Sequence, residues 1–155
     1  MAVANKEGGA MSFDIFLVCM RNGEPATFKR TLAEEVMNRG AIDPDLPLLN
    51  ITYADGGGGV AYIDEDEDID SVSFDHFGGD TFYNRLWELM DRTGSFLFWP
   101  AVGRKLAVTR PEIVSHIDED TVEDLGPAFI VRSGKELEDA IEFGIDPNEP
   151  ENDEE

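Results

Sequence analysis

The sequence is poor in cations and in cysteine. Its 155 residues include 12 Lys and Arg against 34 Asp and Glu, which gives a formal net charge of −22. A chain this acidic repels phosphates, which argues against direct binding to nucleic acid or to an anionic membrane surface. The one cysteine, Cys19, excludes an internal disulfide framework and is typical of a reducing compartment. Because Cys19 lies in an apolar stretch without a basic neighbour, we expect a core residue.

Long apolar runs and catalytic signatures are also missing. No run approaches the roughly 18 residues that a membrane helix needs, and residues 1–10 lack the features of a signal peptide. We therefore expect a cytoplasmic protein. The two histidines form no zinc-binding spacing with cysteine or with each other. We expect His76 to be a hydrogen-bonded strand residue and His116 to favour the negative end of a helix dipole. The sequence predicts no enzyme, cofactor or metal site.

Two stretches imitate ligand-binding motifs without completing them. The glycines at 56–59 lack the Lys-Ser/Thr of a phosphate-binding loop and join two predicted strands. Asp64, Asp66 and Asp68 fall at the first, third and fifth positions of an EF-hand-like loop, and Asp75 falls at the twelfth. Ile69 occupies the sixth position, where such a loop needs glycine, so no specific Ca²⁺ site is predicted.

The chain nevertheless has enough apolar residues to fold. Hydrophobic residues make up 41% and aromatic residues 10% of it, including ten Phe, which a wholly disordered acidic chain would lack. We expect a flexible leader at 1–10, a single domain at 11–144 and a disordered acidic tail at 145–155. Translation starting at Met11 is an alternative to the leader.

The periodicity predicts an α+β domain with a mixed, largely antiparallel sheet of about six to seven strands flanked by three to four helices. The predicted strands are 12–20, 49–54, 60–63, 72–77, 96–99, 106–109 and 128–131. The predicted helices are 28–39, 81–92, a short one at 111–117, and a last one between Ser133 and Gly144.

Several local expectations follow from these elements. The strand at 12–20 is almost continuously apolar, which predicts a central strand covered on both faces. Asp80 is well placed to cap the helix at 81–92, and Ser133 with Glu136 forms a capping box for the last helix. The aromatic stretch that ends at Trp99 is typical of a core strand and hairpin, and it is also rich enough to line a pocket.

Half of the 34 acids fall in three clusters, one of them in the predicted tail. The other two clusters lie within the domain, so its acidity is concentrated locally. Such a patch is either a solubility device or a surface that recognises a basic partner and steers its approach. The residues predicted to bind the partner are Asp64, Glu65, Asp66, Glu67, Asp68, Asp70, Asp118, Glu119 and Asp120.

Three stretches carry a resemblance to other proteins. They are 11–25 with its opening Met-Ser-Phe-Asp-Ile-Phe-Leu, 92–100 with Gly-Ser-Phe-Leu-Phe-Trp-Pro, and 125–136 with Arg-Ser-Gly-Lys-Glu. They resemble a group of small, acidic bacterial cytoplasmic proteins of uncharacterised function that open with the same strand. In size, acidity and α/β make-up the chain is also similar in character to immunity proteins of bacterial toxin systems. That likeness implies no site residues.

Three functional hypotheses remain open from the sequence. The first is an immunity-type inhibitor that neutralises a basic toxin, such as a nuclease, by protein–protein contact. The second is a DNA mimic that occupies a DNA-binding protein. The third is a small-molecule or metal-responsive housekeeping domain that uses the aromatic hairpin near Trp99. The sequence leaves the oligomeric state open.

Overall fold

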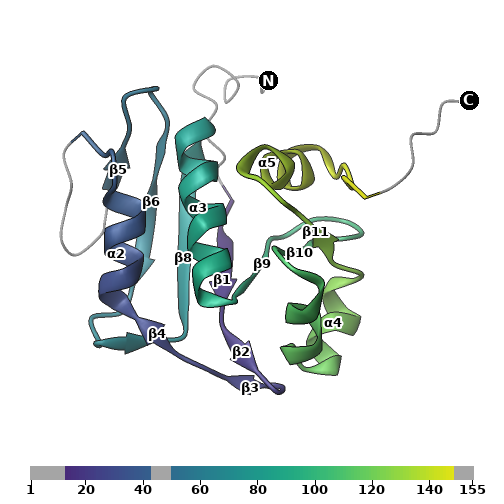
Figure 1. Ribbon diagram of the computed structural model, residues 1–155. Helices are drawn as coiled ribbons and strands as arrows, with labels where there is room; N and C mark the ends of the chain where they lie inside the picture. Colours follow the sequence, from purple (N-terminus) through teal and green to yellow (C-terminus); the bar gives the residue numbers. More distant parts are fainter. Residues whose placement is uncertain (1–12, 43–49, 149–155) are drawn as a thin grey trace, which may run out of the picture.

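The computed structural model describes residues 13–42 and 50–148, which fold around one seven-stranded sheet (Figure 1). The strand order is β11-β10-β9-β1-β8-β6-β5, and every neighbouring pair is antiparallel except β10 and β11. This confirms the predicted α+β class with its largely antiparallel sheet. The strands are β1 (Ile15–Val18), β5 (Asn50–Thr52), β6 (Gly58–Ile63), β8 (Ser71–Gly78), β9 (Phe96–Phe98), β10 (Leu106–Val108) and β11 (Phe129–Ile130).

The helices are divided between the two faces of the sheet. Three long helices, α2 (Arg30–Asn38), α3 (Asp80–Thr93) and α5 (Gly134–Phe143), lie together over one face (Figure 1). The 3₁₀ helix η1 (Pro111–His116) and the helix α4 (Glu119–Leu125) pack on the other face, beside β9, β10 and β11. Four two-residue strands form two small ladders at one end of the sheet: β2 (Met20–Arg21) with β3 (Glu24–Pro25), and β4 (Phe28–Lys29) with β7 (Asp68–Ile69).

Each face of the sheet has its own core, and the two differ in extent. The larger core lies under α2, α3 and α5 and contains Leu17, Phe74 and Phe82, each fully buried. The smaller core joins Phe96, Leu106 and Ile113 beneath η1 and α4. Because η1 and α4 cover only the β9–β11 side, no helix of residues 13–42 and 50–148 lies over the β1, β8 and β6 side of this second face. We call this uncovered part the open face.

The strand predicted at 12–20 is central as expected, since β1 lies between β8 and β9. The expectation that both its faces are covered is wrong for the face that carries Phe16 and Val18. Burial alternates along β1: Ile15 and Leu17 are buried, whereas Phe16 and Val18 are only half-buried. The chain then leaves the sheet at Cys19 and continues as β2.

The N-terminus of α3 is capped differently from the prediction. Asp80 lies in the first turn of the helix, and the N-cap residue, Gly79, offers no side chain. Asp55, from the turn between β5 and β6, supplies the cap instead: its carboxylate accepts the backbone N–H of Thr81 at 3.0 Å and that of Gly57 at 2.8 Å. These two donors hold the pKa of Asp55 below its ordinary value. A carboxylate from the protein therefore occupies the position that an anion would take at a helix N-terminus.

The predicted cap of the last helix is confirmed in part. The Ser133 hydroxyl accepts the N–H of Glu136 at 3.1 Å, while the Glu136 carboxylate accepts the N–H of Arg132, one residue before the expected partner. A Cβ on Gly134 would lie 2.3 Å from an Asn84 side-chain oxygen, so only glycine allows α5 to begin this close to α3.

The predicted leader and most of the predicted tail lie outside the described residues. Residues 145–148 are described, and they are bonded to the domain. Asp146 pairs with Arg104 at 2.6 Å, and the Asn148 side chain donates to the carbonyl of Ile130 at 2.9 Å.

Candidate functional site

The first acidic cluster is the loop between β6 and β8. Asp64, Glu65, Asp66, Glu67 and Asp68 are all exposed, whereas Asp70 is half-buried and its carbonyl accepts the N–H of Cys19 at 2.9 Å. Among the described residues, ion pairs form only at the last two loop acids, where Lys29 lies 3.5 Å from Glu67 and 2.9 Å from Asp68. Arg30 donates to the backbone carbonyls of Asp66 and Glu67, so it holds the loop in place without neutralising its side chains.

The second acidic cluster belongs to α4, an element that the sequence prediction missed. Asp118 is its N-cap: the carboxylate accepts the backbone N–H of Thr121 at 3.3 Å and its hydroxyl at 2.5 Å. Glu119 and Asp120 are exposed in the first turn, where the helix dipole favours negative charge. The residues from Asp118 to Asp120 also line a shallow hollow of about 510 Å³, together with Asn22 and Gly23 of the β2–β3 turn.

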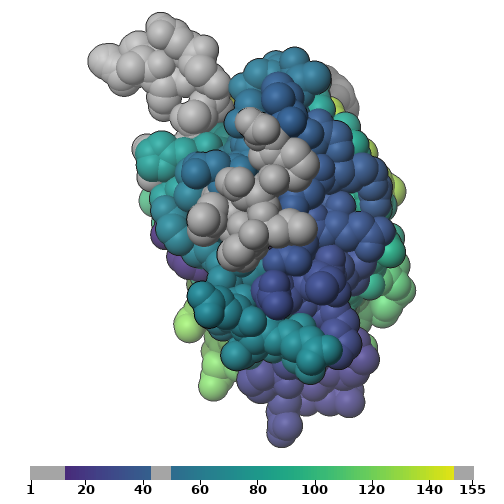
Figure 2. Space-filling model, turned by 90° about the vertical axis from the view of Figure 1, so that its left-hand side faces the viewer, coloured from purple at the N-terminus to yellow at the C-terminus, as the bar shows by residue number. Residues whose placement is uncertain are grey.

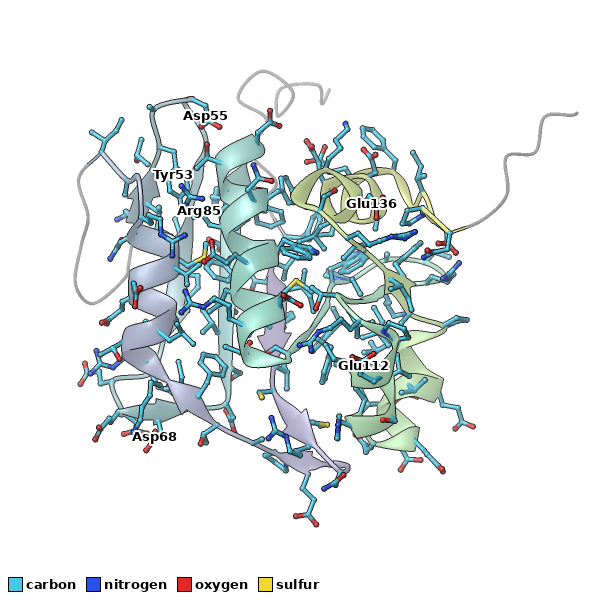
Figure 3. All side chains as sticks on the ribbon, in the orientation of Figure 1. Tyr53, Asp55, Asp68, Arg85, Glu112 and Glu136 are labelled. Carbon is cyan, nitrogen blue, oxygen red and sulfur yellow. The ribbon has the colours of Figure 1, made fainter. Side chains whose placement is uncertain are left out.

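The structure brings both clusters to the same end of the domain. Figure 1 shows β7 and α4 at its lower end, on either side of the β2–β3 hairpin, and Figure 2 shows the same end from the side. The hairpin and the residue before it are bonded to Asp70 of the first cluster and to His116 of η1, two residues before Asp118. Cys19, just before β2, donates to Asp70, and Gly23 and Asn22 donate to the carbonyl and the Nδ1 of His116 at 2.9 and 3.1 Å. We call this region the acidic end; Asp68 lies there, far from Asp55 at the opposite end (Figure 3).

A second feature adjoins the acidic end on the open face. A hollow of about 500 Å³ runs across β6, β8, β1 and β9. The strand register places Tyr62 opposite Ser73, Ser73 opposite Phe16, and Phe16 opposite Phe98. Directly opposed residues of antiparallel strands point to the same face, so these four side chains form one row. Ser73 is short and its neighbours are aromatic, which makes the middle of the row low. We call this hollow the trough.

Carboxylates lie at the edges of the trough. Asp64 lines it directly, and Asp75 is 3.3 Å from the hydroxyl of Tyr62. Partial desolvation, then the charge and hydrogen bond of Asp75, and then the charge of Asp14 raise the pKa of Tyr62. Tyr62 therefore stays a neutral hydrogen-bond donor at physiological pH.

His76 lies at an irregularity in the same sheet. The β6–β8 register shifts between Gly58 and Val60, and His76 there has a positive φ of 50°. Its Nδ1 is 3.1 Å from Asp75, and its side chain is 63% exposed. The neighbouring hollow of about 240 Å³ is lined by His76, by the glycines at 56–59 and by apolar or amide side chains, with Thr52 its one hydroxyl among the described residues.

The other side chains that the sequence singled out, Cys19, Trp99 and His116, are buried in the core or hydrogen-bonded within the fold. Cys19 is 1% exposed and its Sγ lies 3.6 Å from the carbonyl of Thr93; burial raises its pKa, which disfavours the thiolate. Trp99 is buried and stacks on Phe129, with ring centroids 6.1 Å apart, so it is part of the core. His116 lies in the last turn of η1, at the helix end that the sequence predicted, and its Nδ1 accepts the N–H of Asn22. Within the described ranges, no three His, Cys, Asp or Glu side chains gather as a metal would require.

The residues of the trough were missed by the sequence analysis, although a signal for them exists. Ser71, Ser73 and Asp75 alternate with the buried Val72 and Phe74 along β8. Such alternation predicts one covered and one uncovered face. The neighbouring strand at 12–20 shows no such alternation, because apolar residues occupy both of its faces, so its sequence does not indicate an uncovered face.

Comparison with protein-family models, with curated proteins and with solved structures gives no match for this chain. Within residues 13–42 and 50–148, no helix is long and apolar enough to span a membrane.

Proposed function

We propose that the chain is a non-enzymatic acidic binding protein that recognises a basic protein through its acidic end. The observation that carries this proposal is the convergence of two acidic segments, distant in the sequence, at one end of the domain. The most suitable partner is a basic toxin, such as a nuclease, which an immunity-type inhibitor neutralises by direct contact. The active site of a nuclease is basic because it holds phosphates, so an array of carboxylates is complementary to it.

The composition of the acidic end supports this proposal. Asp64, Glu65 and Asp66 make no ion pair within the described residues, so their charge is available to a partner. A concentrated field of this kind increases the rate of encounter with a basic protein by about 10- to 1,000-fold at low salt. The same field destabilises the free protein by self-repulsion, which binding relieves.

The test is an affinity capture with matched baits. The wild-type chain, the E65K/D66K variant and the E35K/D80K control are immobilised, incubated with nuclease-treated lysate of the source organism, and eluted in salt steps. Both variants change the net charge equally, because each replaces two acids with two lysines. All four substituted acids are exposed, so neither variant buries a new charge. Mass spectrometry identifies the eluted proteins, and melting curves verify that each bait is folded.

We expect one basic protein that elutes at intermediate salt from the wild-type and control baits and is lost from E65K/D66K. A toxin as that protein supports the immunity-type inhibitor, and a DNA-binding protein supports the DNA mimic. A spread of basic proteins leaving all three baits at low salt would contradict the proposal and leave the charge as a solubility device.

A further inference from the structure

The trough has the shape and lining of a side-chain receptor. Its floor consists of Ser71 and Ser73, with Tyr62 on one side and Phe16 on the other. Phe16 stacks on Phe98 at a centroid distance of 5.0 Å, which gives that side a broad aromatic surface. Tyr62 is 52% exposed, so its ring is accessible to a partner.

The charged residues that line the trough or act on Tyr62, among those that the structure describes, are all acidic. Asp64 lines it, Asp75 is hydrogen-bonded to Tyr62, and Asp14 acts on the same phenol. None of the described residues that line the trough is Lys or Arg. Aromatic faces and carboxylates together suit a cation with a flat or apolar body, and they repel an anion.

A second copy of this chain does not fit. It would carry the same net charge of −22 and would bring a second set of carboxylates against the first. An occupant of opposite charge removes that repulsion, so the complementary partner is a basic protein.

We propose that the trough receives an arginine side chain of the basic partner, an inference that rests on the proposed function. The stem of the arginine lies over Ser73 between the rings of Tyr62 and Phe16, and its guanidinium meets the carboxylate of Asp64, which lines the trough. Arginine suits this environment better than lysine, because its planar guanidinium stacks on aromatic rings and donates in pairs to a carboxylate. Arginine and tyrosine are also enriched among the residues that dominate interface energies.

This inference gives the two regions different tasks. The acidic end attracts the partner over a distance, and the trough, whose Val18 lies on the same run of chain as the β2–β3 hairpin, fixes it at short range. The hollow exceeds the roughly 300 Å³ at which small-ligand pockets begin, so it accommodates the guanidinium and part of the segment that carries it.

The test uses two synthetic ten-residue peptides of equal charge, one alternating Arg with Gly and one alternating Lys with Gly. Each is titrated into the full ¹⁵N-labelled chain while the backbone amide signals are followed by NMR. The variants are S73W, which fills the trough without changing the charge, and Y62S, which removes one wall. The matched control is F143S, because Phe143 is 67% exposed and lies on α5. Melting curves show whether each variant folds.

We expect the Arg peptide to shift the amide signals of Phe16, Tyr62 and Ser73 and to bind at least about threefold tighter than the Lys peptide. S73W and Y62S should each weaken it about tenfold, and F143S should leave it unchanged. Shifts confined to the acidic end, with S73W binding normally, would contradict an arginine site in the trough but not the proposed function. Absence of binding by both peptides would overturn both.

Discussion

The two faces of the central sheet are built from alternate residues of the same strands, but they end in different environments. Under α2, α3 and α5, Leu17 and Phe74 are fully buried. One residue away on each strand, Phe16 and Ser73 lie on the open face and line the trough. The difference teaches that an apolar residue of β1 or β8 is buried and stabilises the fold on the covered face, whereas on the open face it stays partly exposed. Substitutions on the two faces should therefore separate stability from binding.

The largest expected difference lies between Phe82→Ala and Tyr62→Ser. Phe82 is fully buried and packs on the rings of Phe74 and Phe77, both with centroids 5.5 Å away, so its loss leaves a cavity. We expect Phe82→Ala to lower the free energy of unfolding by about 3–5 kcal/mol. Tyr62→Ser should lower it by less than about 1 kcal/mol, because the side chain is half exposed.

Urea unfolding followed by circular dichroism measures both effects. If Phe82→Ala does not fold, Phe82→Leu gives a smaller loss on the same scale. Equal losses for Phe82→Ala and Tyr62→Ser would contradict the distinction between a covered and an open face.

The next effect concerns how α3 is held over the covered face. Asp55→Ala removes the acceptor of the Thr81 and Gly57 N–H groups and should lower the free energy of unfolding by about 1 kcal/mol at pH 7. Asp80→Ala is the control, because Asp80 makes no cap bond and contributes at most a few tenths of a kcal/mol through the helix dipole.

The pH dependence of Asp55→Ala has a definite sign. The pKa of Asp55 is lowered in the folded state, so its contribution is present above the ordinary aspartate pKa near 4 and is lost as the pH falls through the lowered value. The wild type and Asp55→Ala should therefore differ at pH 7 and converge in strong acid. A larger loss from Asp80→Ala than from Asp55→Ala would restore the cap expected from the sequence.

The sequence predicted the covered face better than the open one, for physical reasons. The helix expected at 81–92 is α3, because its apolar residues recur at helical spacing and Gly94 ends it in a left-handed conformation. The cap of that helix was missed because Asp55 comes from another element, and no local pattern shows which loop will meet a helix end. The same limit applies to the strand at 12–20: its composition is apolar, but only the arrangement of the layers decides which side is covered.

The acidic segments also include features that the local sequence predicts and features that depend on the tertiary arrangement. The exposure of Asp64–Asp68 follows from their charge and was predictable. The helix α4 was missed because its acids dominate the composition, although Asp118 is a standard capping residue and Val122 and Leu125 are spaced to pack on the smaller core. Both segments lie near the β2–β3 hairpin through long-range bonds that local sequence does not show: Cys19, just before β2, donates to Asp70, and Asn22 and Gly23 donate to His116.

The smallest expected effect tests whether repulsion among the exposed carboxylates of the acidic end lowers the stability of the free protein. Glu65→Gln removes one charge from a loop that is crowded with carboxylates, so it should raise the melting temperature at low salt, by no more than about 2 °C. Asp118→Ala removes an equal charge but also the cap of α4, and should lower the melting temperature by about 2–4 °C. Differential scanning calorimetry at 20 mM and 500 mM NaCl separates the two causes, because salt screens repulsion and leaves the cap intact.

If Glu65→Gln lowers the melting temperature as Asp118→Ala does, the loop acids stabilise the fold, and their exposure is no argument for a partner. A rise that disappears at high salt would mean that the exposed acids lower the stability of the free protein, as expected if their charge is complementary to a basic partner.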